Sequence, residues 1–171
     1  VMAEATAQVA ETLGTDYCKV LDLDPETDSL RLCQGVGWND GVVGEATVSA
    51  VDDDSQAAYT LRTDQPVVVT HLETESRFSG PALLTNHRVQ SGISTIIGPF
   101  DEPWGILGAH DTTPRTSSEH DIAFVQSVAN VLASAAARRA GEQELRRQRE
   151  QLEALNSLNS VVREMTTVVI D

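Results

Sequence analysis

The sequence has very little lysine for its charge. Lys19 is the single lysine among twelve basic residues, whereas aspartate and glutamate supply 26 positions and set the formal net charge at -14. Scattered acidity with so little lysine indicates a solvent rich in potassium chloride, in which ionic screening relieves the mutual repulsion of the acidic groups. We therefore expect a protein from a halophilic cell, with a merely acidic surface as the alternative.

Basic residues are few in the larger part of the chain. Residues 1–137 hold twenty acidic and six basic residues, while residues 138–171 hold six of each. The field of so acidic a surface repels nucleic acid and anionic membranes. Direct contact of this chain with nucleic acid or with a membrane is therefore not expected.

Cysteine is also scarce, and long apolar runs are absent. Cys18 and Cys33 lie in apolar, strand-like stretches, and the sequence shows neither a signal peptide nor an apolar run near the length of a membrane span. These features predict a reduced, cytoplasmic setting. Because Val1 precedes Met2 and the first residues already follow a helical pattern, we expect a fragment of a longer protein with neighbouring domains on both sides.

Sequence motifs for catalysis, metal binding and phosphate binding are missing. Catalysis needs a nucleophile beside a base, or metal ligands at suitable spacing, and the four histidines stand apart at positions 71, 87, 110 and 120. The glycines at positions 35, 37 and 41 lack the spacing of the dinucleotide-binding fingerprint. We therefore predict a non-catalytic chain without a metal site.

What the sequence does contain is a series of short apolar strands among amphipathic helices. A helical stripe from Met2 to Leu13 ends at Gly14, a natural C-terminal stop. Turn-forming residues predict two hairpins, one over residues 17–36 and one over residues 91–107. Between the hairpins the pattern predicts short helices at 55–63 and 82–88 and a short strand at 67–70.

A long helix is predicted from Ser118 onward, where Ser118 and Asp121 form an acidic variant of the capping box. The helix continues past Gly141, because one interior glycine costs only about 1 kcal/mol. Two overlapping heptad seams follow it, formed by Leu145, Leu152, Leu155, Leu158, Val162, Met165 and Val169. The seams favour a parallel two-stranded coiled coil, and hence a homodimer, over an amphipathic helix that packs on its own domain.

Five blocks of sequence, in a fixed order and spacing, resemble the GAF domain family over residues 2–137. The blocks are Tyr59-Thr-Leu-Arg-Thr63 before Pro66-Val-Val-Val69, the segment 78–89, Ser91-Gly-Ile-Ser94, Trp104-Gly-Ile-Leu-Gly-Ala-His110, and the last helix. The resemblance implies an α+β fold with a central antiparallel sheet. The first and last helices would cover one face, and residues 38–90 would form a ligand cover on the other.

The resemblance also implies two domains and a place for a ligand. Residues 1–137 would be the sensory domain, and residues 138–171 a signalling helix that leads to a further domain. In this family small molecules, when they bind, lie between the sheet and the cover. The candidate pocket residues are Tyr59, His71, Phe78, Leu84, His87, Ile93, Thr95, Ile97 and His110. Each of them also has a plain reading as a core residue, or as a histidine with satisfied ring nitrogens.

The ligand itself stays unidentified. Relatives that reduce methionine sulfoxide need cysteines in the cover, and bilin-binding relatives need a cysteine beside a histidine there; neither occurs around Asn86-His87. The Asn-Lys-Phe-Asp-Glu signature of cyclic-nucleotide-binding relatives is absent. Haem held by His71 or His87 stays open but is disfavoured.

The tail from residue 152 to residue 164 resembles connectors in haloarchaeal sensor histidine kinases and in bacterio-opsin-activator-like regulators.

Two functions remain open for the chain. In the first, the chain is a sensory module of a two-component or related system that binds a small molecule and relays the event through the coiled coil. In the second, it is a dimerisation and relay module without a ligand.

Overall fold

The computed structural model describes residues 1–52 and 54–169. The last two residues of the expected 138–171 helix lie outside the described residues. The chain divides into two compact units, Val1–Ser134 and Ala135–Asp171. The elements, in order, are α1 (Met2–Leu13), β1 (Tyr17–Asp24), β2 (Ser29–Val36), β3 (Thr47–Ser49), α2 (Gln56–Leu61), β4 (Val67–Val69), the 3-10 helix η1 (Leu72–Thr74), α3 (Ala82–Asn86), β5 (Ser91–Ile97), β6 (Gly105–Asp111) and α4 (Glu119–Val169).

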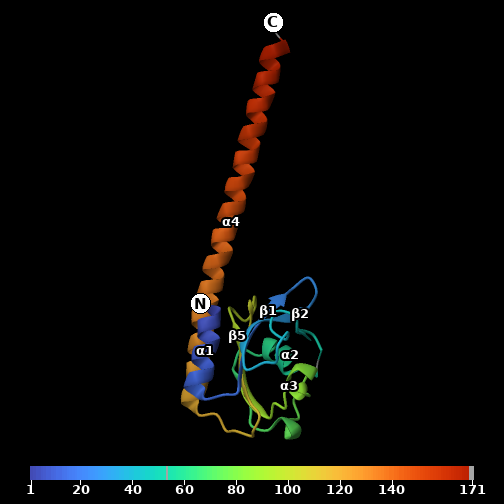
Figure 1. The fold of residues 1–171 in the computed structure, drawn as a ribbon, viewed down its shortest axis with the longest axis vertical. Coiled ribbons are helices and arrows are strands. Elements are labelled where there is room, and N and C mark those ends of the chain that lie inside the picture. The colour runs from blue at the N-terminus through green and yellow to red at the C-terminus, as the bar shows by residue number, and fades with distance from the viewer. Residues whose placement is uncertain (53, 170–171) are drawn as a thin grey trace. The chain divides into compact units, whose positions relative to one another are not determined.

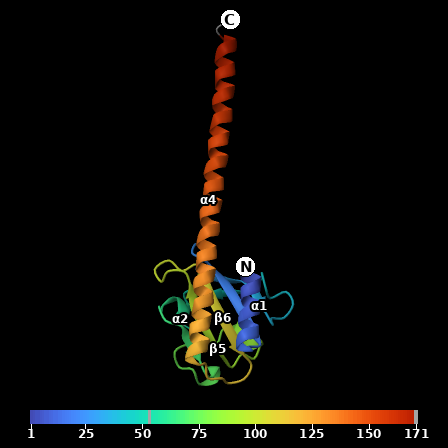
Figure 2. The same ribbon diagram turned by 90° about the vertical axis from the view of Figure 1, so that its left-hand side faces the viewer.

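The first unit is built around one antiparallel sheet with the strand order β3-β2-β1-β6-β5-β4. Helix α1 lies on one side of the sheet, whereas α2 and α3 lie on the other (Figure 1). Figure 2 shows α1 beside the first turns of α4, with β5 and β6 behind them. The expected α+β arrangement, with helices on one face and a cover on the other, is confirmed.

Local sequence signals explain where several elements begin and end. Gly14 adopts a left-handed conformation with φ 63°, and its N–H bonds back to the end of α1, as a helix-terminating glycine does. At the start of α4, the Asp121 N–H donates to Ser118 Oγ at 3.1 Å and the Ser118 N–H donates to Asp121 Oδ2 at 2.9 Å. The capping box predicted there is therefore confirmed. Strand β3 and the turn η1 were not expected from the sequence.

The sheet has an apolar core on each face. The core on the helix side contains Val9, Leu13, Cys18, Val20, Ile93, Ile97, Leu107, Ala109, Val125, Ala129 and Leu132. The core on the cover side contains Leu21, Leu30, Leu32, Val48, Ala57, Leu83 and Ile106. Both faces of β5 and β6 are buried, so polar side chains of these strands, such as Ser94, Thr95 and His110, lie in the interior together with the apolar ones.

The second unit is the part of α4 from Ala135 onward. Its apolar side chains at Leu145, Leu152, Leu155, Leu158, Val162 and Met165 are all exposed. The expected coiled coil stays a prediction. Within the described residues, no helix combines the length and the apolar character that crossing a membrane requires.

Candidate functional site

The register of β1, β6 and β5 brings a lysine and a histidine together on the cover side of the sheet. Lys19 pairs with Gly108, and Gly108 pairs with Ser94. In the next row, Tyr17 pairs with His110, and His110 pairs with a second glycine, Gly92. Directly paired residues of an antiparallel sheet point to the same face, and so do residues two apart along a strand.

Three aromatic rings close over this part of the sheet. The Trp38 ring centroid lies 4.8 Å from that of Tyr17, 4.9 Å from that of His87 and 6.4 Å from that of His110. The Lys19 Nζ atom lies 5.9 Å from the Trp38 ring centroid, within the range of a cation–π contact. We call these five residues, Tyr17, Lys19, Trp38, His87 and His110, the Lys19 site.

Hydrogen bonds fix the outer members of the Lys19 site. The Trp38 indole N–H donates to the backbone oxygen of Cys18 at 2.8 Å, and the Tyr17 hydroxyl donates to the backbone oxygen of His87 at 3.3 Å. His87 Nδ1 lies 2.8 Å from the backbone oxygen of Leu83, and Nε2 accepts the Asn39 N–H at 3.4 Å. Both ring nitrogens of His87 are therefore engaged, in the pattern of a tautomer protonated at Nδ1.

The two inner members of the Lys19 site are a histidine without hydrogen-bond partners and a lysine without a counter-charge. His110 is fully buried, and neither of its ring nitrogens has a hydrogen-bond partner among the described residues. Lys19 is 3% exposed, and across residues 1–52 and 54–169 no carboxylate pairs with its ammonium group. Buried polar groups normally have partners, so two such groups side by side need an explanation.

Burial shifts both groups toward their uncharged forms. It lowers the pKa of Lys19 from 10.5 to about 7, because the ammonium group has lost its hydration. The pKa of His110 lies well below 6.5, first because of burial and second because of the nearby Lys19 charge. A neutral His110 ring has one donor and one acceptor nitrogen. The Lys19 site therefore holds a hydrogen-bond donor on His110 and a lysine that gains or loses its proton near neutral pH.

Two glycines leave space for the His110 ring. A Cβ atom on Gly108 would lie 2.8 Å from His110 Nε2 and 3.1 Å from Lys19 Cε, and one on Gly92 would overlap His110 Nδ1. The ring therefore lies across a patch of bare backbone, and any larger residue at either glycine would displace it. This explains why glycine occupies both positions.

A polar cluster ties α2 to the sheet next to the Lys19 site. The Gln56 side-chain amide donates to Ser94 Oγ at 3.1 Å, and the hydroxyl groups of Thr60 and Ser94 lie 2.7 Å apart. All three side chains are buried. Their mutual hydrogen bonds hold the cover to the strand that pairs with β6.

The nine residues predicted for the pocket fall into different places. His87 and His110 lie in the Lys19 site, and Leu84 is fully buried in α3 of the cover. His71 is half-buried and precedes η1. Tyr59 and Phe78 form a separate ring pair with centroids 5.3 Å apart.

The β5 residues that face the cover are not the ones that were predicted to do so. Ile93 and Ile97 belong to the helix-side core, and Thr95 shares their face by alternation. Ser94 faces α2 instead. These three predicted residues therefore cannot line a pocket under the cover. The error arises because β5 is buried on both faces, so its apolar pattern does not reveal which residues face which side.

An arginine covers the ring pair of Tyr59 and Phe78. The Arg77 guanidinium carbon lies 5.5 Å from each ring centroid, and its nitrogens donate to both carboxylate oxygens of Glu75 at 2.8 and 2.7 Å. Hydrogen bonds from Arg77 lower the pKa of Glu75 to about 2. An open groove of about 520 Å³ begins beside Phe78, and its walls include Leu72, Glu73, Gly80, Thr85, Arg88 and Gln90.

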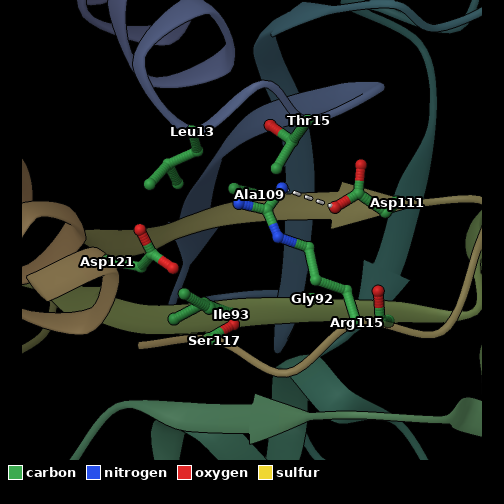
Figure 3. Close-up of a pocket in the computed structure, with 10 residues that line it drawn as sticks. Leu13, Thr15, Gly92, Ile93, Ala109, Asp111, Arg115, Ser117 and Asp121 are labelled. Atoms are coloured by element: carbon green, nitrogen blue, oxygen red, sulfur yellow. Dashed lines mark hydrogen bonds and ion pairs between the residues drawn. The ribbon is translucent and has the colours of Figure 1, made fainter. Parts of the chain in front are cut away.

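A second, much smaller cavity lies on the helix side of the sheet. It has a volume of about 10 Å³, enough for about one water molecule. Figure 3 shows Arg115 reaching Asp111 across it, with Asp121 and Thr15 on its rim; the Arg115–Asp111 ion pair measures 3.1 Å. The Thr15 hydroxyl is buried there without a protein partner in the described part of the chain.

Two features of the sequence point to the Lys19 site. Histidines 87 and 110 come from blocks that were singled out, but Tyr17, Lys19 and Trp38 were missed. Lys19 is the single lysine of the chain and stands in an apolar strand, an unusual position for an unpaired charge. Within the described residues, no three histidine, cysteine or acidic side chains gather as metal ligands would.

Comparison with known proteins identifies the fold. The model of the GAF domain family matches residues 1–136. No curated protein matches the chain significantly.

Similar solved structures include three of different kinds. The phycocyanobilin-bound GAF domain of a cyanobacterial phytochrome is 24% identical with a TM-score of 0.65, covering 82% of this chain and 84% of its own. A domain of a putative two-component sensor histidine kinase from Sinorhizobium meliloti is 13% identical with a TM-score of 0.66. The match covers 84% of this chain and 93% of the kinase domain. Free methionine-R-sulfoxide reductase from Neisseria meningitidis, in complex with its substrate, is 18% identical with a TM-score of 0.66. The match covers 81% of this chain and 78% of the reductase. These identities are low, so the likeness establishes the fold alone.

Proposed function

Because this chain belongs to the GAF domain family, we propose that it is the sensory module of a larger signal-transduction protein and that a small molecule binds at the Lys19 site. The observation that carries the proposal is a buried lysine without a carboxylate counter-charge, Lys19, beside a buried histidine whose ring nitrogens have no hydrogen-bond partner among the described residues, His110. Groups of this kind are costly in a structural core and are typical of ligand sites.

The known ligand chemistries of relatives fit this chain poorly. Both ring nitrogens of His87 are engaged with backbone groups, which disfavours this residue as a haem ligand. Burial raises the pKa of Cys18 to about 12 and that of Cys33 to about 11. Thiols with such pKa values are weak nucleophiles at neutral pH, which supports a regulatory rather than a catalytic role.

We further propose that the signal leaves through α4 and that two chains pair along it. The sheet strands connect the two faces of the first unit, because residues that alternate along β5 and β6 contact the cover on one side and α1 and α4 on the other. The exposed leucines of residues 145–158 are the expected contact between two chains. The parent protein would be a histidine kinase or a related regulator of a salt-adapted cell, in keeping with the likeness to a sensor-kinase domain and with the acidic composition.

One observation favours the alternative of a ligand-free dimerisation module. The Trp38 ring packs over Lys19 and against the rings of Tyr17 and His87, so in this conformation the protein itself fills the space above Lys19. A ligand would have to displace that ring.

A mass-spectrometric analysis of compounds extracted from the purified full chain tests the proposal. The matched variant is Gly108→Val, which places side-chain atoms where His110 and Lys19 lie. Recovery of a stoichiometric compound from the unmodified chain, and its absence from the folded variant, would support a sensor. Two folded, dimeric proteins that carry nothing and show no thermal shift with cell extract would support the ligand-free module instead.

A further inference from the structure

The Lys19 site offers a specific set of groups to a ligand. Lys19 supplies an ammonium group, and the neutral His110 ring supplies one N–H, while the nearby hydroxyls of Ser94 and Thr60 are already bonded to each other. Among the described residues, no acidic side chain pairs with Lys19. The site is therefore a buried positive centre without a counter-charge.

We propose that the ligand is a small organic carboxylate, whose two oxygen atoms accept hydrogen bonds from Lys19 Nζ and from the His110 ring. This inference rests on the proposed function and names the chemical class of its ligand. A carboxylate supplies the missing negative charge and has two acceptor oxygens for the two donors. A cation would be repelled by the ammonium group, and a phosphate group would bring up to two negative charges to a single positive group.

The remaining walls fit the carbon part of such a ligand. The rings of Tyr17 and His87 have centroids 5.6 Å apart and present apolar surface beside the place that the Trp38 ring occupies. Trp38 is half-buried, and its side chain is held by a hydrogen bond from Nε1 to the Cys18 backbone oxygen. Gly37, Gly41 and Gly44 all have positive φ angles around it. We infer that the ligand enters by replacing the indole ring above Lys19.

The charge state of Lys19 makes the binding pH-dependent. The titratable groups around Lys19 are His110 from β6 and His87 from the end of α3, with Tyr17 on the same face of its own strand and the adjacent Cys18 on the opposite face. The low pKa of His110 and the high pKa of Cys18 keep both groups uncharged near neutral pH. The carboxylate prefers the protonated lysine, so affinity is highest below the pKa of Lys19, about 7, and falls above it.

Fluorescence titration of the full chain provides the test. The background variant Trp104→Phe leaves Trp38 as the single tryptophan, because the chain contains two. Benzoate and acetate are the carboxylate probes, benzamide is the neutral isostere of benzoate, and inorganic phosphate is the competing anion. We expect saturable quenching by a carboxylate probe and a dissociation constant that rises about tenfold for each pH unit above the pKa of Lys19.

Three variants separate the site from the rest of the chain. Lys19→Met should weaken carboxylate binding by at least about tenfold at low pH, a loss of one ammonium contact. His110→Phe, which keeps the ring and removes its nitrogens, should also weaken it. Arg138→Met removes an exposed positive charge in the second unit and should leave binding unchanged.

The outcomes distinguish this inference from the proposed function. Equal binding of benzoate and benzamide, tighter binding of phosphate, or full binding by Lys19→Met would overturn the carboxylate assignment. So would a neutral compound recovered from the purified chain and retained by Lys19→Met, although the sensory function would then stand. A chain that carries no compound and binds no probe would overturn both.

Discussion

Lys19 should make the stability of the chain depend on pH in an unusual direction. Burial lowers the pKa of Lys19 from 10.5 in the unfolded chain to about 7 in the folded one. Between these two values the unfolded state binds more protons than the folded state, so the free energy of unfolding rises with pH. The slope for one group is about 1.4 kcal/mol per pH unit.

The full effect follows from the size of that shift. Below pH 7 the folded state holds a buried ammonium group, and over the 3.5-unit difference between 10.5 and about 7 its cost reaches about 5 kcal/mol. That figure is a large fraction of the 5 to about 15 kcal/mol that stabilises a typical domain. Lys19→Met keeps the length of the side chain and removes the charge, so it should stabilise the chain most at low pH and least near pH 10.

The assay is denaturant unfolding of the full chain and of Lys19→Met across this pH range at constant potassium chloride. The difference between the two free energies reports the loss of the Lys19 charge, including its influence on the titration of His110 and Cys18. Lys19→Arg is the matched control: a permanently charged side chain should destabilise the fold at every pH and show no such slope. Parallel curves for the unmodified chain and Lys19→Met would refute the reasoning, since they would mean that water reaches the ammonium group.

Three further predictions concern other parts of the molecule. Replacing Leu155 and Leu158 together with glutamate should halve the mass measured by light scattering at high salt and leave residues 1–134 folded, whereas an unchanged dimer mass would reject the leucine seam. Cys18 and Cys33 should react slowly with iodoacetamide at pH 8 in the folded chain and rapidly after unfolding, because burial holds their pKa values near 12 and 11; rapid labelling of the folded chain would contradict this. The thermal midpoint should rise strongly with potassium chloride and the fold should be lost below roughly molar salt; a midpoint insensitive to salt would remove the halophilic interpretation.

Signals that act over a few residues were read correctly from the sequence. The stop at Gly14 and the capping pair of Ser118 and Asp121 depend on hydrogen bonds within one helical turn, and the structure contains both. The family resemblance then supplied the sheet and its two covered faces. Neither kind of information fixes which residues of a doubly buried strand face which side, so Ile93 and Ile97 were assigned to the wrong face.

The Lys19 site required information that no local pattern contains. Lys19 and His110 meet because β1 pairs with β6, two strands about ninety positions apart in the sequence. Trp38 comes from a glycine-rich loop whose position depends on that pairing. A sequence shows that a lysine stands in an apolar strand, but the missing carboxylate is visible only when every neighbour in space is known.

The cost of burying Lys19 also explains how a ligand could drive a change in the protein. Without a ligand, the protonated lysine destabilises the closed conformation, in which Trp38 covers it. A carboxylate would offset that cost only in a conformation that admits it, so it would bind two conformations with different affinities, which is the requirement for shifting a population. The residues next to His110 and Ser94 along their strands, Ala109 and Ile93, pack in the helix-side core with Leu13 and Val125. A displacement of the cover-side residues therefore reaches α1 and the first turns of α4 through a single peptide unit, so the change should be largest where these two helices meet the sheet.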